Sequence, residues 1–486
     1  MVQNILLNEE GKTKLKILNR VRELGKGQYP IYFFENELGF SYVKTSKLIH
    51  SMDMELQQLD PHFHLLNDRD KIEIKGDIPY FEDYQRFLCR QSLSYRFLLS
   101  TILYPNKSMA DFCIEEKLSQ SSVMRRLRPL ISYLKESHIR LNCLQMKLTG
   151  KESVIRMIIT HFIWYVSFGE DLTNYFAKEK ELHMEELFSP EDSRWMIYGE
   201  EKEWNVYQGV ALLRIQQGYV IDENIFQTFS LPVINKKFRE ILTEQKLSET
   251  AIQRENHFIG YAMFYKIQYF SIHDPRLKYV KKYLETNKVV SEHTQNFYDF
   301  CVKELFSTKI SSEQNKLIWI DLFNLFLKKD IFPEVVFSYN LSTSTLMTHY
   351  HPMLLKLKKK INQFLDREYR FESARLKERE DLLILLSAIV LPYFEEEKVK
   401  KTVHLGIAGV QDESLLHFLF YHLKQITGIE IEICGNKLDK KYDLLLSSAT
   451  RFLPEPMTTP YYILDTENMQ MIHHIQKKID SLLLEN

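Results

Sequence analysis

Three closely spaced arginines are the side chains in this sequence best suited to bind phosphate groups or base edges. Arg125, Arg126 and Arg128 follow two serines, Ser121 and Ser122. An arginine guanidinium can donate paired hydrogen bonds to a phosphate or to O6 and N7 of guanine. Apolar residues recur around them at helical spacing, so we predict a helix that buries one stripe and exposes the arginines. The members of that stripe are Val123, Leu127, Leu130 and Leu134.

The elements that must position these arginines have the order of a helix-turn-helix. Residues 108–119 predict a short helix, residues 118–120 a polar break, and residues 119–136 a longer helix whose first N–H groups Ser121 or Ser122 could cap. In such a motif the second helix lies in the DNA major groove. Pro129 lies inside this second helix, so we predict a kink there, with a helix broken in two as the alternative.

The segment after the second helix predicts a two-stranded wing, because residues 138–150 alternate between apolar and polar side chains. One face would carry the apolar residues Ile139, Leu141, Leu144, Met146 and Leu148. The other face would carry Arg140, Gln145 and Lys147. We expect Gln145 and Lys147 to contact the DNA backbone, which positions the protein without reading sequence.

A second unit of the same kind is predicted at the start of the chain. Helices are expected over residues 9–24, 30–40 and 41–59, the last capped by Ser41, followed by a hairpin of residues 62–66 and 71–75 around a turn at 67–70. A small packing module that binds no DNA is the alternative. If the unit binds DNA, the residues that play the parallel roles are Tyr42, Lys44, Ser46, Lys47 and His50.

The rest of the chain divides into a helical region and an α/β region. Residues 151–397 predict successive helices that could form two bundles. Residues 403–409, 429–434, 442–448 and 461–465 predict buried strands, and residues 412–426, capped by Asp412, predict a crossover helix. Strands that alternate with helices indicate a small parallel sheet.

Length and composition limit the classes of protein that need to be considered. A chain of 486 residues with 44% hydrophobic residues suits three to five packed domains, and 15 Gly with 14 Pro favour a mainly helical fold. No stretch predicts a membrane span or a secretory signal. The five cysteines are scattered, so we expect a cytoplasmic protein with neither disulfides nor a zinc site. The net charge of −1 means that any DNA-binding charge must be local, and it predicts backbone-dominated binding with limited sequence specificity.

The complete order of units resembles the Mga/AtxA family of PRD-containing transcriptional (virulence) regulators of Gram-positive bacteria. The most specific stretches are LSQSSVMRRLRPL at 118–130 and LTGKESVIRMIITHFIW at 148–164. The resemblance implies two winged helix-turn-helix domains at 1–78 and 79–158. It further implies PRD-like helical domains at 159–280 and 281–397, and an enzyme-IIB-like α/β domain at 398–486.

The resemblance also implies regulation by the sugar phosphotransferase system through phosphorylated histidines. The candidates at mixed polar and apolar positions are His257, His349 and His351, although a histidine in a helix is more often a packed or surface residue. An enzyme-IIB domain of this type carries its phosphoryl group on a cysteine after the first strand. Residues 406–413 contain no cysteine, and Cys434 follows the second strand, so catalysis is not expected. The sequence contains no Walker A, HExxH or GxSxG motif, so other enzyme classes lack support, and neither a cofactor nor a metal is expected.

These expectations together describe a homodimeric regulator that binds double-stranded promoter DNA. Dimerisation would use the C-terminal domain and the second PRD-like domain, phosphotransferase proteins are possible partners, and no membrane is involved. One alternative is a PRD-containing RNA-binding antiterminator, which would need a small β domain at the N-terminus. Another is a non-catalytic binding protein linked to the phosphotransferase system.

Overall fold

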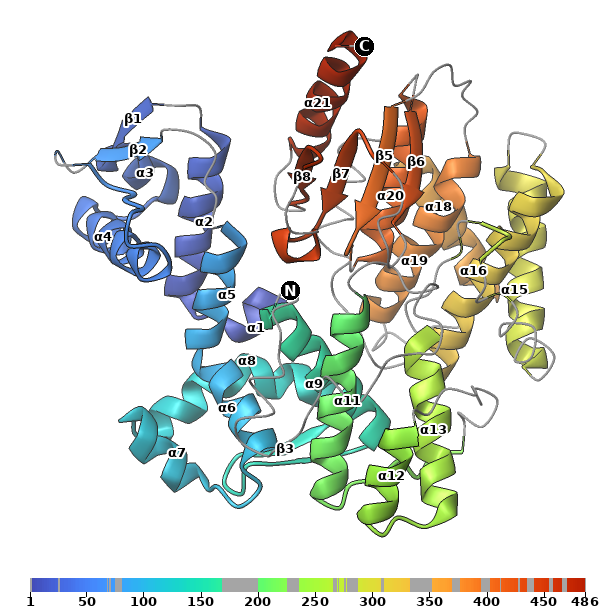
Figure 1. Cartoon of the computed structure of the whole chain (residues 1–486), viewed down its shortest axis with the longest axis horizontal. Helices are drawn as coiled ribbons and strands as arrows, with labels where there is room; N and C mark the ends of the chain where they lie inside the picture. The colour runs from blue at the N-terminus through green and yellow to red at the C-terminus, as the bar shows by residue number, and fades with distance from the viewer. Residues whose placement is uncertain are drawn as a thin grey trace. The chain divides into compact units, whose positions relative to one another are not determined.

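A computed structural model of the chain shows two compact units (Figure 1). Unit 1 comprises residues 1–135, 140–148 and 162–168, and unit 2 comprises residues 136–139, 149–161 and 169–486. The structure describes residues 2–24, 27–67, 69, 71–74, 81–167, 200–224, 236–264, 269, 271–274, 277, 287–306, 310–332, 352–368, 376–394, 403–410, 412–426, 429–434, 441–453, 458–465 and 470–485.

Unit 1 begins with a small module of helices and a two-stranded sheet. Its elements are α1 (Val2–Leu6), α2 (Glu9–Glu23), β1 (Gly27–Pro30), α3 (Ile31–Leu38), α4 (Tyr42–Leu59) and β2 (Lys71–Ile74). The Asn8 side chain caps α2 by accepting a hydrogen bond from the Gly11 N–H at 2.8 Å. Helices α2, α3 and α4 agree closely with those expected from the sequence.

The strand pairing in this module differs from the predicted hairpin. Strand β2 pairs antiparallel with β1, with Gly27 opposite Ile74 and Pro30 opposite Lys71. Residues 62–66 form no strand and contribute only an isolated bridge between Leu66 and Ile72. The glycine- and proline-containing residues 27–30, which sequence patterns favour as a break, pair with β2 because Ile72 and Ile74 are buried. Tertiary burial here overrides local strand propensity.

The second module of unit 1 contains the predicted helix-turn-helix and wing. Its elements are α5 (Phe81–Gln91), α6 (Leu93–Leu103), α7 (Met109–Glu116), α8 (Gln120–Glu136), β3 (Arg140–Asn142), β4 (Lys147–Thr149) and α9 (Glu152–Ser167). Helix α9 passes from unit 2 into unit 1 after His161. Ser108 starts α7 with a reciprocal capping box, in which Asp111 is the partner. Helices α1, α5 and α6 were not expected from the sequence patterns.

The helical region of unit 2 matches the expected run of helices within the described residues. It contains α11 (Glu200–Gln216), α12 (Lys236–Glu244), α13 (Glu249–Phe264), α15 (Lys288–Phe300), the π-helix η4 (Cys301–Leu305), α16 (Ser312–Ile331), α18 (Pro352–Glu368) and α19 (Leu376–Val390). Aromatic rings pack between helices α15, α16 and α18. Phe297 contacts Phe326 at 5.9 Å and Phe364 at 5.3 Å between ring centroids.

The C-terminal part of unit 2 is the predicted parallel sheet with helices. The sheet order is β6 (Ile429–Ile433), β5 (Val403–Ala408), β7 (Leu444–Ser447) and β8 (Tyr461–Ile463), and every neighbouring pair is parallel. Helix α20 (Glu413–Gln425) packs against β6, and α21 (Met471–Glu485) packs against β5. Two short 3₁₀ turns, η6 (Leu391–Tyr393) and η7 (Thr450–Phe452), complete the described elements. Asp412 caps α20 as predicted, accepting hydrogen bonds from Ser414 and Leu415.

None of the described helices has the length and apolar character needed to cross a membrane. The described residues also contain no group of three or more histidine, cysteine, aspartate or glutamate side chains placed to hold a metal ion.

Candidate nucleic-acid interface

The turn between α7 and α8 is formed by a residue in the left-handed backbone region. Lys117 has φ 52° and its N–H donates to the carbonyl groups of Cys113 and Ile114, while the Leu118 N–H donates to Cys113 at 3.0 Å. These bonds satisfy the last carbonyl groups of α7 and end that helix. Helix α8 then begins at Gln120, so the two helices are joined by the tight turn of a helix-turn-helix.

The residue that caps α8 is Ser119, and the prediction of Ser121 or Ser122 was wrong. Ser119 precedes the helix, and its hydroxyl accepts a hydrogen bond from the Ser122 N–H at 3.3 Å. The Val123 N–H donates to the Ser119 carbonyl at 3.0 Å, which is the first bond within the helix. Ser121 and Ser122 therefore lie in the first turn and do not cap it. The hydroxyl of Ser121 is 3.1 Å from that of Ser119, and Ser121 is exposed while Ser122 is half-buried.

Helix α8 is fixed by the apolar stripe that the sequence predicted. Val123, Leu127 and Leu130 are fully buried and Leu134 is almost so. In the same module, Phe97 of α6 and Phe112 of α7 meet edge to face at 4.9 Å between ring centroids. Tyr133 contacts Phe162 of α9 in the same way at 5.6 Å. Burial of this stripe orients the opposite face of α8 away from the core.

That opposite face is an exposed stripe with strong positive charge. Successive turns of α8 place five exposed residues on this face, namely Ser121, Arg125, Arg128, Ser132 and Lys135. Arg126 is exposed beside them. Within the part of the chain that the structure describes, Arg125, Arg126 and Arg128 form no hydrogen bond or ion pair. Their donors are therefore available to an external anion. We call Arg125, Arg126, Arg128 and Lys135 the basic stripe.

The acidic residues of α7 are engaged within their own module. Asp111 accepts hydrogen bonds from Ser108, which hold the pKa of its carboxyl below the ordinary value. Glu115 pairs with Lys107, and Glu116 pairs with Arg96 at 2.7 Å. These partners offset the negative charge of α7, so the basic stripe is not neutralised by ion pairs to the preceding helix.

Pro129 lies on the exposed side of α8, and the helix remains one element from Gln120 to Glu136. The predicted alternative of a helix broken near Arg128 is therefore wrong. Proline has no N–H, so the carbonyl of Arg125 lacks its usual partner within the helix. Because α8 is continuous, Arg125 and Arg128 still share one face. The predicted kink itself stays a prediction.

The wing agrees with the predicted alternation except at its turn. Ile139, Leu141, Met146 and Leu148 are buried, while Arg140, Gln145 and Lys147 are exposed. Leu144, which alternation assigns to the buried face, is instead 62% exposed. The reason is the turn at 143–146, where Met146 takes a left-handed φ of 49° and interrupts the strand geometry.

In the first module, some of the predicted DNA-binding side chains are exposed and others are half-buried. Tyr42, Lys44 and Lys47 on α4 are exposed, and the ammonium of Lys44 lies 3.5 Å from the centre of the Phe40 ring. Ser46 and His50 are less exposed, and His50 Nδ1 donates to the Ser46 carbonyl oxygen at 2.8 Å. Ser41 occupies the predicted cap position of α4, but its side chain makes no capping bond.

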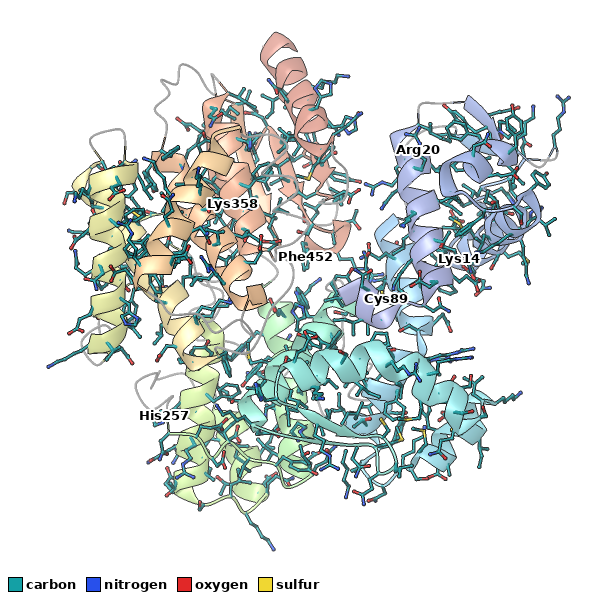
Figure 2. All side chains as sticks on the ribbon, turned by 180° about the vertical axis from the view of Figure 1, so that it is seen from behind. Lys14, Arg20, Cys89, His257, Lys358 and Phe452 are labelled. Carbon is teal, nitrogen blue, oxygen red and sulfur yellow. The ribbon has the colours of Figure 1, made fainter. Side chains whose placement is uncertain are left out.

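A partly buried polar joint connects the two modules of unit 1. Lys14 on α2 pairs with Glu55 on α4 at 2.7 Å, and the Tyr84 hydroxyl on α5 donates to the same carboxylate at 2.6 Å (Figure 2 labels Lys14). Burial, followed by the negative charge of Glu55, raises the pKa of Tyr84. The sequence patterns did not predict this joint. Its signal was a lysine at position 14, on the apolar stripe of Ile17, Leu18 and Val21.

Of the three histidines proposed as phosphorylation sites, only His257 lies among the described residues. His257 is half-buried on α13 (Figure 2), two residues after the buried Glu255. His349 and His351 lie outside the described residues.

The end of the first strand of the C-terminal sheet is occupied by the protein itself. Gly409 follows β5 with φ 62°, and the Phe452 ring packs so closely that a Cβ atom on Gly409 would overlap it. Cys434, at the end of β6, is fully buried, and burial raises the pKa of its thiol to about 12. A thiol with so high a pKa is a poor nucleophile at neutral pH.

Part of the chain matches a known protein family. Residues 81–163 match the family model of the Mga helix-turn-helix domain. No curated protein matches the chain. The family match confirms the resemblance to the Mga/AtxA regulators over α5 to α9, the segment that contains the basic stripe and the wing. A helix-turn-helix domain of this family supports a DNA-binding transcriptional regulator.

Proposed function

We propose that this protein regulates transcription by binding double-stranded promoter DNA, with α8 in the major groove and the wing on the adjacent backbone. The observation that carries the proposal is the basic stripe, whose three arginines have no partner among the described residues, inside the segment that matches the Mga helix-turn-helix domain. Arginines at such positions can contact guanine edges or phosphates. The first module would add Tyr42, Lys44 and Lys47, which are exposed on α4.

The test is a titration of fluorescent promoter DNA with the wild-type protein and Arg125→Ala/Arg126→Ala at several salt concentrations. Each phosphate contact that is lost should reduce the slope of log affinity against log salt by about 1. A matched control is Lys288→Ala/Lys303→Ala, which removes the same charge from two positions in unit 2. Equal affinity and equal salt slope for the arginine variant and the control would contradict the proposal.

We further propose that sugar status regulates the protein through phosphorylation of His257, His349 and His351. His257 supports it through its place on α13, because Glu255, two residues earlier on the same helix, pairs with Arg156 on α9, the helix that follows the wing. A phosphoryl group adds a charge of about −1.5 to −2 and could change this packing. Incubation with the phosphotransferase proteins and labelled phosphoenolpyruvate should give acid-labile label that His257→Ala reduces. Absence of any label would refute this part.

The C-terminal α/β domain is proposed to bind partners without catalysis. Together with the second PRD-like domain, residues 281–397, it is proposed to form a homodimer. The buried Cys434 and the Phe452 ring against Gly409 favour a role other than phosphoryl transfer. Sedimentation of the full chain over a range of concentrations tests the dimer, and a monomer at every concentration would refute it.

The RNA-binding antiterminator is less well supported. It requires a small β domain at the N-terminus, whereas the described residues 2–24 and 27–67 are mainly helical, with one short strand.

A further inference from the structure

Leu144 projects into solvent from the turn of the wing, between two buried residues. Its side chain is 62% exposed, while Cys143 and Met146 are 7% and 1% exposed. An exposed leucine is ordinary on a protein surface, so exposure alone indicates nothing. The construction of the turn and the charge around it give this leucine its significance.

The turn is held in one shape by bonds on both sides of Leu144. The Asn142 side chain accepts a hydrogen bond from the Gln145 N–H at 3.2 Å and donates to the Gln145 side chain at 3.1 Å. The Leu144 carbonyl accepts a hydrogen bond from the N–H of Met109, the first residue of α7, at 3.1 Å. The wing turn is thus attached to the helix-turn-helix, and the Leu144 side chain is directed outward by a fixed backbone.

The surroundings of Leu144 favour a polyanion as the partner. Residues 137–150 contain no aspartate or glutamate, and Arg140 and Lys147 are exposed on the same wing. A hydrophobic protein surface would not require this charge, whereas phosphates on both sides of a DNA groove would. Proteins that insert an apolar side chain between base pairs from the minor groove partly unstack them and bend the duplex by about 20–90°.

We propose that the wing inserts Leu144 into the DNA minor groove, with Arg140 and Lys147 on the flanking phosphates, and bends the duplex. The inference rests on the proposed function and deepens it, because it assigns shape-dependent recognition to the wing while α8 occupies the major groove. Flexible pyrimidine–purine steps would be the preferred insertion points, since they unstack most easily.

The experiment uses the full-length protein and a short duplex recovered by selection from a randomised pool with the wild type. Donor and acceptor dyes at the duplex ends report the bend by energy transfer, and 2-aminopurine at the central steps reports unstacking. Wild type should raise both signals, Leu144→Ala should return them to the values of free DNA, and Leu144→Met should retain them. Leu144→Ala should also keep the wild-type salt slope, unlike Arg125→Ala/Arg126→Ala. Val289→Ala is the matched control, because Val289 on α15 is also 62% exposed.

The possible failures are distinguishable. Binding by wild type with no bend, or the same bend for Leu144→Ala and wild type, would overturn the inference and leave DNA binding intact. A change of oligomeric state in Leu144→Ala, with the bend unchanged, would assign Leu144 to a contact between copies and also overturn it. If the selection recovers no duplex at all, the proposed function fails and this inference fails with it.

Discussion

Arg156 and Glu255 form a doubly hydrogen-bonded ion pair with no exposure to solvent on either side chain. Arg156 Nη1 lies 2.6 Å from Glu255 Oε2, and Nη2 lies 3.0 Å from Oε1. Glu152 accepts further hydrogen bonds from Arg156 at 3.0 Å and from Arg214 at 2.9 and 2.7 Å. Two positive and two negative charges thus offset one another inside unit 2. They join α9, which follows the wing, to α11 and α13.

Removing one member of this network should destabilise unit 2 strongly. Breaking a buried pair leaves the remaining charge without compensation, and we expect Arg156→Met to cost about 3–5 kcal/mol. Urea denaturation monitored by hydrogen exchange in α13 measures the effect. Arg239→Ala is the control, because Arg239 forms an exposed pair with Glu249 whose loss should cost at most about 1 kcal/mol. If Arg156→Met and Arg239→Ala lose the same free energy of unfolding, burial of the ion pair does not explain its contribution to stability.

The joint between the two modules of unit 1 makes a separate prediction. Tyr84→Phe removes the hydroxyl that donates to Glu55 at 2.6 Å, and loss of a hydrogen bond to a charged group should cost about 1.5–3 kcal/mol. Hydrogen exchange in α4 and α5 during urea denaturation measures the change. Tyr32→Phe removes the hydroxyl of a tyrosine that is 59% exposed, so its effect should stay within about 0.5 kcal/mol. Comparable effects of the two substitutions would show that the joint contributes nothing.

Gly409→Ala should destabilise the C-terminal domain for two reasons. Its φ of 62° disfavours a side chain by about 1–2 kcal/mol, and a Cβ atom there would overlap Phe452. Gly39→Ala is the matched control, since its φ is 66° and no atom lies within 4 Å of the position that an alanine methyl group would take. Gly409→Ala should therefore lower the stability of its domain more than Gly39→Ala lowers that of its own. Chemical denaturation gives both values.

A double-mutant cycle separates the two contributions at Gly409. In a Phe452→Ala background the overlap disappears, so Gly409→Ala should cost only the backbone contribution there. An equal cost of Gly409→Ala in both backgrounds would show that the Phe452 contact adds no strain.

His417 should make the C-terminal domain sensitive to acid. Burial, with the nearby Lys424 charge, lowers the pKa of His417 to about 3 from an ordinary value of 6.5. The unfolded chain binds the proton more readily, so this stability is present above pH 6.5 and is lost as the pH falls toward 3. We expect a slope of up to about 1.4 kcal/mol per pH unit in that window. Urea denaturation as a function of pH measures it.

One substitution isolates the contribution of His417. His417→Leu should flatten the pH dependence below the ordinary histidine pKa. If His417→Leu keeps the wild-type slope, groups other than His417 cause the acid sensitivity.

Local patterns in the sequence were enough to predict most elements and the face on which the candidate site lies. The spacing of Val123, Leu127, Leu130 and Leu134 indicated which side of α8 is buried, and the structure places the arginines on the exposed side. Asp412 marked the start of α20, and the alternation of strands and helices indicated the parallel sheet. These features are local, because helical periodicity, capping and strand patterns depend on neighbours within a few residues.

The partners of distant residues, by contrast, came only from the folded chain. Folding paired β2 with residues 27–30 in place of the expected residues 62–66. It turned Leu144 outward and placed Glu55 between Lys14 and Tyr84. It also joined Arg156 to a glutamate 99 positions away. Such contacts form because a buried charge or an apolar strand must find a complementary group, and many distant residues of the right type are available. Only the packing of the whole unit selects among them.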